Sequence, residues 1–159
     1  IDSVFWSSHC PIAVTRLLIS PTEVRSILVP VKDLTTKTIA MVRFAQILAD
    51  ANQATLLLFH LFAPRTPSEQ VARFESQLAD IVARSTSRTT EVSSIEPQIE
   101  TLVSDNIAQA IVAKAQSFDL VVLRAARYRT AGGLAVSEVT TQAIRELNCS
   151  VVLLGEPHS

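Results

Sequence analysis

The segment DLVVLRAARYRTAGGLAVSEVTTQAI (Asp119–Ile144) decides the fold of this chain. It begins with a continuous apolar run, passes through a loop that holds three arginines, and continues into a stretch with helical spacing. In many α/β proteins a phosphate binds where a strand, a loop and a helix follow in this order, because the helix N-terminus attracts anions. Two of the chain's three glycines, Gly132 and Gly133, lie in the loop and indicate a turn or a mobile segment. The segment therefore predicts part of an α/β sheet and raises the question of whether a nucleotide binds there.

Short apolar runs of the same kind recur along the chain. Continuous runs of this length are typical of strands that are covered on both faces, as in a parallel sheet. The predicted strands are Ser26–Val31, Ala54–Phe62, Asp119–Leu123 and Ser150–Leu154, with the more polar Pro97–Val103 as an edge strand.

Between these strands, apolar residues recur at the spacing of helices. We expect the helices to begin at Thr35 or Thr36, at Pro67-Ser68, at Asp105 and at Ser137. The Ser- and Thr-rich stretch Arg84–Glu96 is predicted to be a surface loop. Strands that alternate with helices imply right-handed crossovers and a three-layer α/β domain around a parallel sheet.

Composition excludes several classes of function. The 159 residues are 48% hydrophobic and 18% charged, which predicts one ordered domain. A formal net charge of −1 gives no attraction to nucleic acid, so we expect no nucleic-acid partner. Cys10 and Cys149 have no metal-binding spacing, and no catalytic motif is present, so we predict neither a metal site nor an enzyme. His60 lies in an apolar run and is interpreted as a structural histidine.

The first twenty residues fit a repeat. The segment SSHCPIAVTRL (Ser7–Leu17) resembles ELNCSVVLLGE (Glu146–Glu156) in its polar start, its cysteine and its apolar run. We therefore predict that residues 1–20 are the last strand and linker of a preceding, truncated repeat, and that residues 21–159 form the domain itself. The alternative is an unrelated N-terminal strand.

The combination of ILVPV, LLLFH, DLVVL and CSVVLL as successive strands resembles the universal stress protein family over Arg25–Leu154. The resemblance implies the adenine nucleotide alpha hydrolase-like fold, a five-stranded parallel sheet of order 3-2-1-4-5. The segments FWSSHCPIAVTRLL, RSILVPVKDLT, GLAVSEVTTQ and GEPHS are similar to the tandem universal stress tails of bacterial monovalent cation:proton (Na+/H+) antiporters.

In this family the fifth strand pairs antiparallel with its counterpart in a partner domain. The resemblance therefore implies that the N-terminal strand pairs antiparallel at the edge of the fifth strand, which would otherwise be exposed. The predicted interface residues are Pro11, Ile12, Ala13, Val14, Val151, Val152 and Leu153. A homodimer through the same edge is also expected, and whether the N-terminal strand pairs within its own chain or is swapped stays open.

Members of the family that bind ATP carry Gly-x-x-Gly, nine residues, and then Gly-Ser or Gly-Thr after the fourth strand. In this sequence those glycines fall on Arg124, Arg127 and Ser137, with Glu138 next to the last position. Arginine side chains fill the space that glycine leaves for a ligand, and a carboxylate at the helix N-terminus repels an anion. The resemblance also places Lys32 where the family has an acidic residue, with Asp33 just after it, and Leu61 near the adenine.

We therefore interpret the loop as a degenerate nucleotide site and expect no cofactor, with ATP or another adenine nucleotide disfavoured. Its candidate ligand-binding residues are Lys32, Leu61, Arg124, Arg127, Ser137, Glu138 and Val139. Two alternatives stay open for the basic residues. They could grip a small anion such as a phosphate or a cyclic dinucleotide, or they could pair with Asp33, Glu138 or a carboxylate of another domain.

The resemblance implies a non-catalytic regulatory or assembly domain on the cytoplasmic side of the inner membrane. Its expected partners are the transmembrane antiporter domain of the same polypeptide and the preceding universal stress repeat. The alternative functions are a nucleotide-binding universal stress protein (ATP, AMP or cyclic dinucleotide) in stress signalling, and an assembly module without a ligand.

Overall fold

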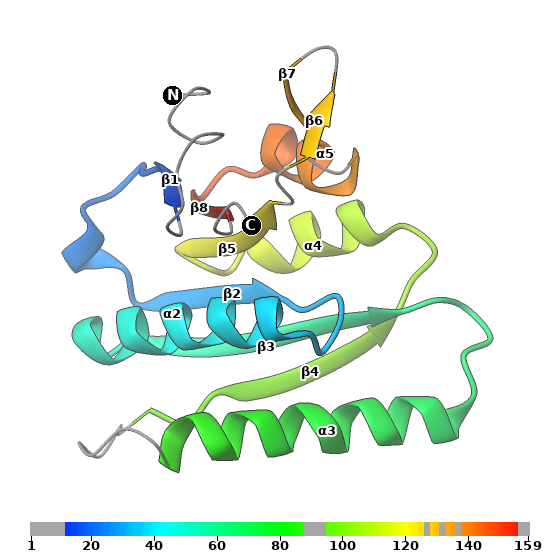
Figure 1. The fold of residues 1–159 in the computed structure, drawn as a ribbon. Helices are drawn as coiled ribbons and strands as arrows, with labels where there is room; N and C mark the ends of the chain where they lie inside the picture. The colour runs from blue at the N-terminus through cyan, green and yellow to red at the C-terminus, as the bar shows by residue number, and fades with distance from the viewer. Residues whose placement is uncertain (1–11, 88–94, 126–127, 131–132, 136–137, 156–159) are drawn as a thin grey trace.

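The computed structural model describes residues 12–87, 95–125, 128–130, 133–135 and 138–155. Its main sheet has the strand order β1-β8-β5-β2-β3-β4 (Figure 1). Neighbouring strands from β4 to β8 pair in parallel, whereas β1 pairs antiparallel with β8. The bounds are β1 Ile12–Arg16, β2 Ser26–Pro30, β3 Thr55–Phe62, β4 Gln98–Val103, β5 Leu120–Ala125 and β8 Ser150–Gly155. The predicted sheet and its additional N-terminal strand are therefore confirmed.

Helices cover both faces of this sheet and complete the three layers. They are the 3-10 helix η1 Pro21–Glu23 and the α-helices α2 Thr36–Asn52, α3 Ser68–Ser87, α4 Ile107–Ala115 and α5 Glu138–Glu146. Strand β2 shows why its apolar run is continuous. Ile27 and Val29 face the core under α2 and α3, whereas Leu28 faces the core under α4 and α5. All three side chains are fully buried.

Several boundaries differ from the sequence-based expectation. Helix α3 continues to Ser87, so the first residues of the predicted loop Arg84–Glu96 are helical. The N-cap of α4 is Asn106 rather than Asp105, because the Asn106 side chain accepts a 3.1 Å hydrogen bond from the backbone N–H of Gln109. The predicted cap at Ser137 lies outside the described residues. Two short antiparallel strands, β6 Tyr128–Thr130 and β7 Gly133–Ala135, form a hairpin that was not predicted.

Side-chain hydrogen bonds add to the pairing of β1 with β8. Each residue of β1 has a partner in Val151–Gly155, from the pair Ile12–Gly155 to the pair Arg16–Val151. The Arg16 guanidinium also donates hydrogen bonds of 3.1 Å to the Ile144 carbonyl and 2.9 Å to the Leu147 carbonyl, at the C-terminal end of α5. The predicted antiparallel pairing is confirmed for residues 12–16, and Pro11 lies outside the described residues.

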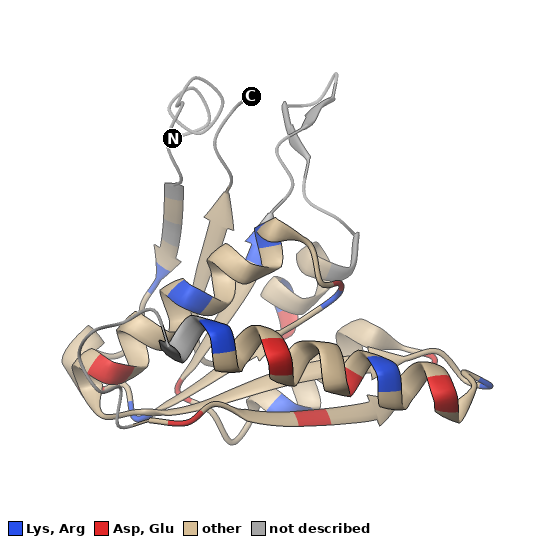
Figure 2. Cartoon of the chain, turned by 60° about the horizontal axis from the view of Figure 1, so that its bottom comes forward, with Lys and Arg blue, Asp and Glu red and all other residues tan. Residues whose placement is uncertain are grey.

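Charge is mixed over the outer face of the domain. In Figure 2 basic and acidic residues are interspersed along the long helix α3, which covers the β4 side of the sheet. Along α3, therefore, the charged residues do not form a continuous basic stripe.

Candidate functional site

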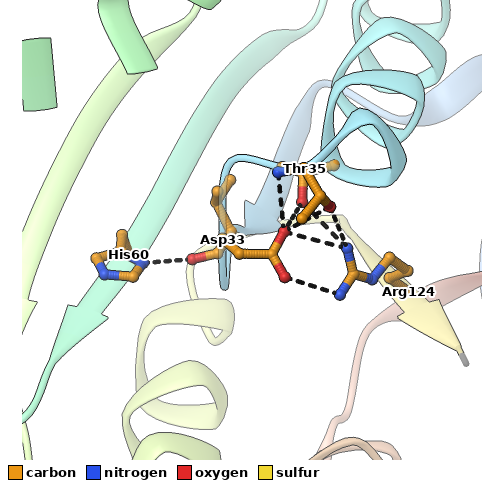
Figure 3. Close-up of polar contacts among 6 residues, drawn as sticks. Asp33, Thr35, His60 and Arg124 are labelled. Carbon is orange, nitrogen blue, oxygen red and sulfur yellow. Dashed lines mark hydrogen bonds and ion pairs between the residues drawn. The ribbon is translucent and has the colours of Figure 1, made fainter. Parts of the chain in front are cut away.

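The candidate site lies at the carboxyl ends of β2 and β5. These neighbouring strands are the point where the strand order reverses, which is where doubly wound domains bind their ligands. Arg124 lies near the end of β5, and Asp33 lies in the turn between β2 and α2. Their side chains point toward each other (Figure 3).

Arg124 and Asp33 form a two-pronged ion pair. Arg124 Nη2 donates to Asp33 Oδ2 at 3.1 Å, and Arg124 Nη1 donates to Asp33 Oδ1 at 3.3 Å. The planar guanidinium matches the planar carboxylate, which makes this geometry stronger and more specific than a single contact. For Arg124, the pairing with Asp33 that was one of the alternatives is thus the arrangement that the structure contains.

Two threonines complete the surroundings of the Asp33 carboxylate. Its Oδ1 accepts hydrogen bonds from the Thr35 backbone N–H at 3.2 Å, the Thr35 hydroxyl at 2.8 Å and the Thr38 hydroxyl at 2.7 Å. Thr35 is the N-cap residue of α2, so the carboxylate lies at the positive end of this helix. Arg124 Nη1 also donates to the two threonine hydroxyl oxygens, at 3.3 and 3.2 Å.

This environment strongly favours the ionised form of Asp33. Burial alone would raise the pKa of the carboxyl group, but hydrogen bonds from Thr38, Arg124 and Thr35 together hold its pKa far below the usual 3.8. The carboxylate is therefore ionised at neutral pH, bound by a guanidinium and a helix N-terminus. These are the groups that bind the phosphate of a ligand in other proteins.

The remaining predicted ligand residues have no described contact with Arg124 or lack described side chains. Lys32 is exposed, Leu61 is half-buried, and no described contact joins either of them to Arg124. Glu138 and Val139 form the first turn of α5, where only the backbone is described, while Arg127 and Ser137 lie outside the described residues. Their roles as ligand-binding residues stay predictions.

The sequence analysis missed the role of three residues in the cluster that Arg124, Asp33, Thr35 and Thr38 form. Asp33, Thr35 and Thr38 supply most of its hydrogen bonds but were not among the predicted ligand residues. The signal was present in DLTTKT, where an aspartate follows a buried strand and threonines recur in the first turn of a helix.

His60 is a buried histidine whose contacts hold the chain next to the candidate site. Its ring Nδ1 hydrogen-bonds the Val31 carbonyl at 2.5 Å (Figure 3). The ring stacks on Phe74 with centroids 3.8 Å apart. Burial lowers the pKa of His60 below 6.5, and the Val31 hydrogen bond only partly offsets this. These contacts are those of the structural histidine that the sequence predicts.

Neither metal ligation nor membrane insertion is indicated by the described part of the chain. None of its His, Cys, Asp and Glu residues gather in a group of three that could hold a metal ion. Within the same residues, no helix has the length and apolar character that crossing a bilayer requires.

The fold and the cluster define a doubly wound α/β domain whose switch point is occupied by its own ion pair. The sequence profile of the universal stress protein family matches residues 23–155, and the chain belongs to that family. The Na(+)/H(+) antiporter NhaS5 of Synechocystis sp. is 38% identical over 159 residues, which cover 100% of this chain and 22% of the antiporter. The chain thus spans about a fifth of that relative's length.

Solved structures show the same fold. The universal stress protein of Archaeoglobus fulgidus in complex with dAMP superimposes with a TM-score of 0.60 at 18% identity, covering 82% of this chain and 97% of that chain. A universal stress protein from Archaeoglobus fulgidus DSM 4304 superimposes with a TM-score of 0.63 at 13% identity, covering 99% of this chain and 54% of that one.

Proposed function

We propose that this domain is a non-catalytic regulatory and assembly module of a monovalent cation:proton antiporter, on the cytoplasmic side of the membrane. The domain would act by binding other parts of the transporter rather than by binding a nucleotide. Such binding shifts a transporter's conformational equilibrium only if the contacts differ between its two states. Similarity to an antiporter along the whole chain supports this proposal.

The Arg124–Asp33 ion pair is the observation that carries the proposal. Arg124 stands at the position of the first glycine of the family's ATP motif, and its guanidinium is held by Asp33 and two threonines. A triphosphate bound at this position would have to break that pair and would meet the Asp33 negative charge. The degenerate loop is therefore proposed to be a structural element.

The preceding repeat is the proposed partner at the other edge of the sheet. Aligning Cys10 with Cys149 makes residues 12–16 equivalent to residues 151–155, and these two segments are the ones that pair in β1 and β8. The central pair is Val14 with Leu153, which are themselves equivalent positions. A pseudo-twofold axis through this pair is the symmetry expected when two copies of one domain meet edge to edge.

Removal of the N-terminal strand tests this assignment. A chain lacking residues 1–19 exposes the apolar edge of β8, and we expect it to form a homodimer through that edge. Size-exclusion chromatography with light scattering measures the mass. A monomer at all accessible concentrations would contradict the proposed repeat interface.

The second candidate function is nucleotide binding in stress signalling, which is favoured by the family relative solved with dAMP. A thermal-shift screen with ATP, AMP and cyclic dinucleotides separates the two functions. Our proposal predicts no shift with any of them. A shift that is lost in R124A and R127A would establish the nucleotide site instead.

The regulatory role itself is tested on the complete antiporter polypeptide. Purified protein with and without this domain is reconstituted into proteoliposomes, and proton exchange is measured with Na+ and with K+. We expect exchange to persist without the domain but with an altered rate or pH dependence. Identical transport by both forms would refute the regulatory role.

A further inference from the structure

The edge of β8 can pair with either of two strands. One is β1, which occupies this edge in the structure, and the other is β8 of a second copy of the chain. Because residues 12–16 are equivalent to residues 151–155, both strands can meet β8 in the same antiparallel register. The backbone ladder is then the same in the two pairings, so a preference between them has to come from side chains and from the residues just beyond the strand.

Arg16 is the first feature that distinguishes the two strands. Its guanidinium donates hydrogen bonds to three carbonyls at and just beyond the end of α5, those of Ile144 at 3.1 Å, Leu147 at 2.9 Å and Cys149 at 3.5 Å. The last carbonyls of a helix have no donor within the helix, and the negative end of the helix dipole attracts a cation. In a pairing of β8 with β8, Gly155 takes the position of Arg16, and glycine has no side chain to make these contacts.

The chain just after β1 supplies a second contact. The Leu18 backbone N–H donates a 2.9 Å hydrogen bond to the Ser150 hydroxyl, and Ser150 is only 1% exposed. A buried hydroxyl that loses a hydrogen-bond partner destabilises the complex. The residue equivalent to Leu18 in the second repeat is Pro157, which stands at the same distance after the aligned cysteine. Proline has no backbone N–H, so a second copy of the β8 segment cannot donate this hydrogen bond.

We propose that the edge of β8 is selective for the last strand of the preceding repeat over a second copy of itself, and that Arg16 and the Leu18 amide determine this selectivity. Both contacts lie outside the backbone ladder, and the C-terminal repeat has the donor for neither of them. The edge therefore pairs two different repeats in preference to two identical domains. The inference rests on the proposed repeat interface for its register, and it adds which of the two repeats the edge accepts.

The test begins from the complete chain with a protease site inserted between Ile19 and Ser20. The folded chain is labelled at its N-terminus and cleaved, and fluorescence anisotropy during dilution measures how tightly the fragment of residues 1–19 stays bound to the domain. Light scattering on the same samples measures the mass of the domain. We expect the wild-type fragment to stay in a one-to-one complex, and the domain to self-associate only where the fragment has dissociated.

Variants of the two contacts separate selectivity from general strand pairing. R16M keeps a long side chain but removes its donors, so the dissociation constant of the fragment should rise at least about tenfold, whereas R16K should retain part of the affinity. S150A removes the acceptor of the Leu18 amide and should weaken fragment binding without weakening self-association of the domain. T15A alters an exposed residue of β1 outside both contacts and should leave fragment binding unchanged.

Equal binding of the wild-type and R16M fragments would overturn the proposal. So would a homodimer of the domain that persists when an equal amount of the wild-type fragment is present. A domain that stays monomeric after the R16M fragment has dissociated would support the selectivity, because the edge then rejects a second copy altogether, but it would contradict the self-pairing expected under the proposed function. The two failures are therefore distinguishable.

Discussion

Replacing Arg124 with alanine is the perturbation that isolates the central ion pair. The variant removes four hydrogen bonds that the guanidinium donates, two to the Asp33 carboxylate and one each to Thr35 and Thr38. The carboxylate keeps its hydrogen bonds from the two threonines, so it stays ionised but loses its counter-charge.

The expected cost follows from geometry and exposure. Hydrogen bonds to charged groups contribute about 1.5–3 kcal/mol when buried, whereas exposed ion pairs contribute about 0–1 kcal/mol. Because 23% of the Arg124 side chain and 35% of the Asp33 side chain remain exposed, water screens part of this interaction. We therefore expect R124A to lower the free energy of unfolding by about 1–2 kcal/mol, or the Tm by about 3–6 °C.

The effect also has a characteristic pH dependence. The folded-state pKa of Asp33 is depressed, so the stability that its ionised form contributes is complete above the unfolded value of 3.8 and is lost as the pH falls below it. R124A reduces this depression of the pKa. The difference in stability between wild type and R124A should therefore be largest near pH 7 and shrink below about pH 4.

Urea unfolding of wild type, D33A, R124A and the double variant measures the coupling between the two residues. We expect a coupling energy of about 1 kcal/mol at pH 7. K114A serves as a matched control, because it removes the 2.7 Å pair with Glu100 that has no threonine support, and it should cost less. A coupling near zero, or a pH-independent R124A effect, would refute the role assigned to the pair.

Three further predictions concern stability. R16A removes the hydrogen bonds to the end of α5, so the β1 amides should exchange with solvent about tenfold faster in hydrogen-exchange measurements, while R16K should retain part of the protection. Since the pKa of His60 is lowered on folding, the free energy of unfolding should decrease as the pH falls through 6.5, and H60F should abolish this dependence in urea titrations. Gln53 caps α2 with φ of 52°, a left-handed conformation that glycine adopts more readily, so Q53G should raise the free energy of unfolding by about 0.5 kcal/mol in the same assay.

The sheet could be predicted because its central strands are buried on both faces. Residues such as Ile27, Leu28 and Val29 must all be apolar when helices cover both sides, and this leaves a continuous run in the sequence. The position of β1 could be predicted because its segment resembles the last strand in an internal repeat, and because the family resemblance implies antiparallel pairing at that edge. The β6–β7 hairpin could not be predicted, because three-residue strands in an arginine-rich loop have no periodic signal.

The candidate site was predicted only in part. The family resemblance pointed to this position, because arginines stand at 124 and 127 where the family's ATP motif has glycines. The loss of a nucleotide site there stays a prediction. The carboxylate that binds Arg124 could not be assigned from the sequence, because Asp33 and Arg124 are 91 residues apart and only the strand order brings them together. The family resemblance therefore singled out Lys32, and Asp33 was left as one possible partner among several.

The central claim is that the Arg124–Asp33 ion pair stands where a nucleotide would bind. A structure of the domain from crystals grown with ATP and Mg²⁺ tests it most directly. We predict that the Arg124 guanidinium remains within hydrogen-bond distance of both Asp33 carboxylate oxygens and that no nucleotide density lies beside it. A triphosphate bound against β5 and the first turn of α5, with Arg124 turned away from Asp33, would contradict the proposal.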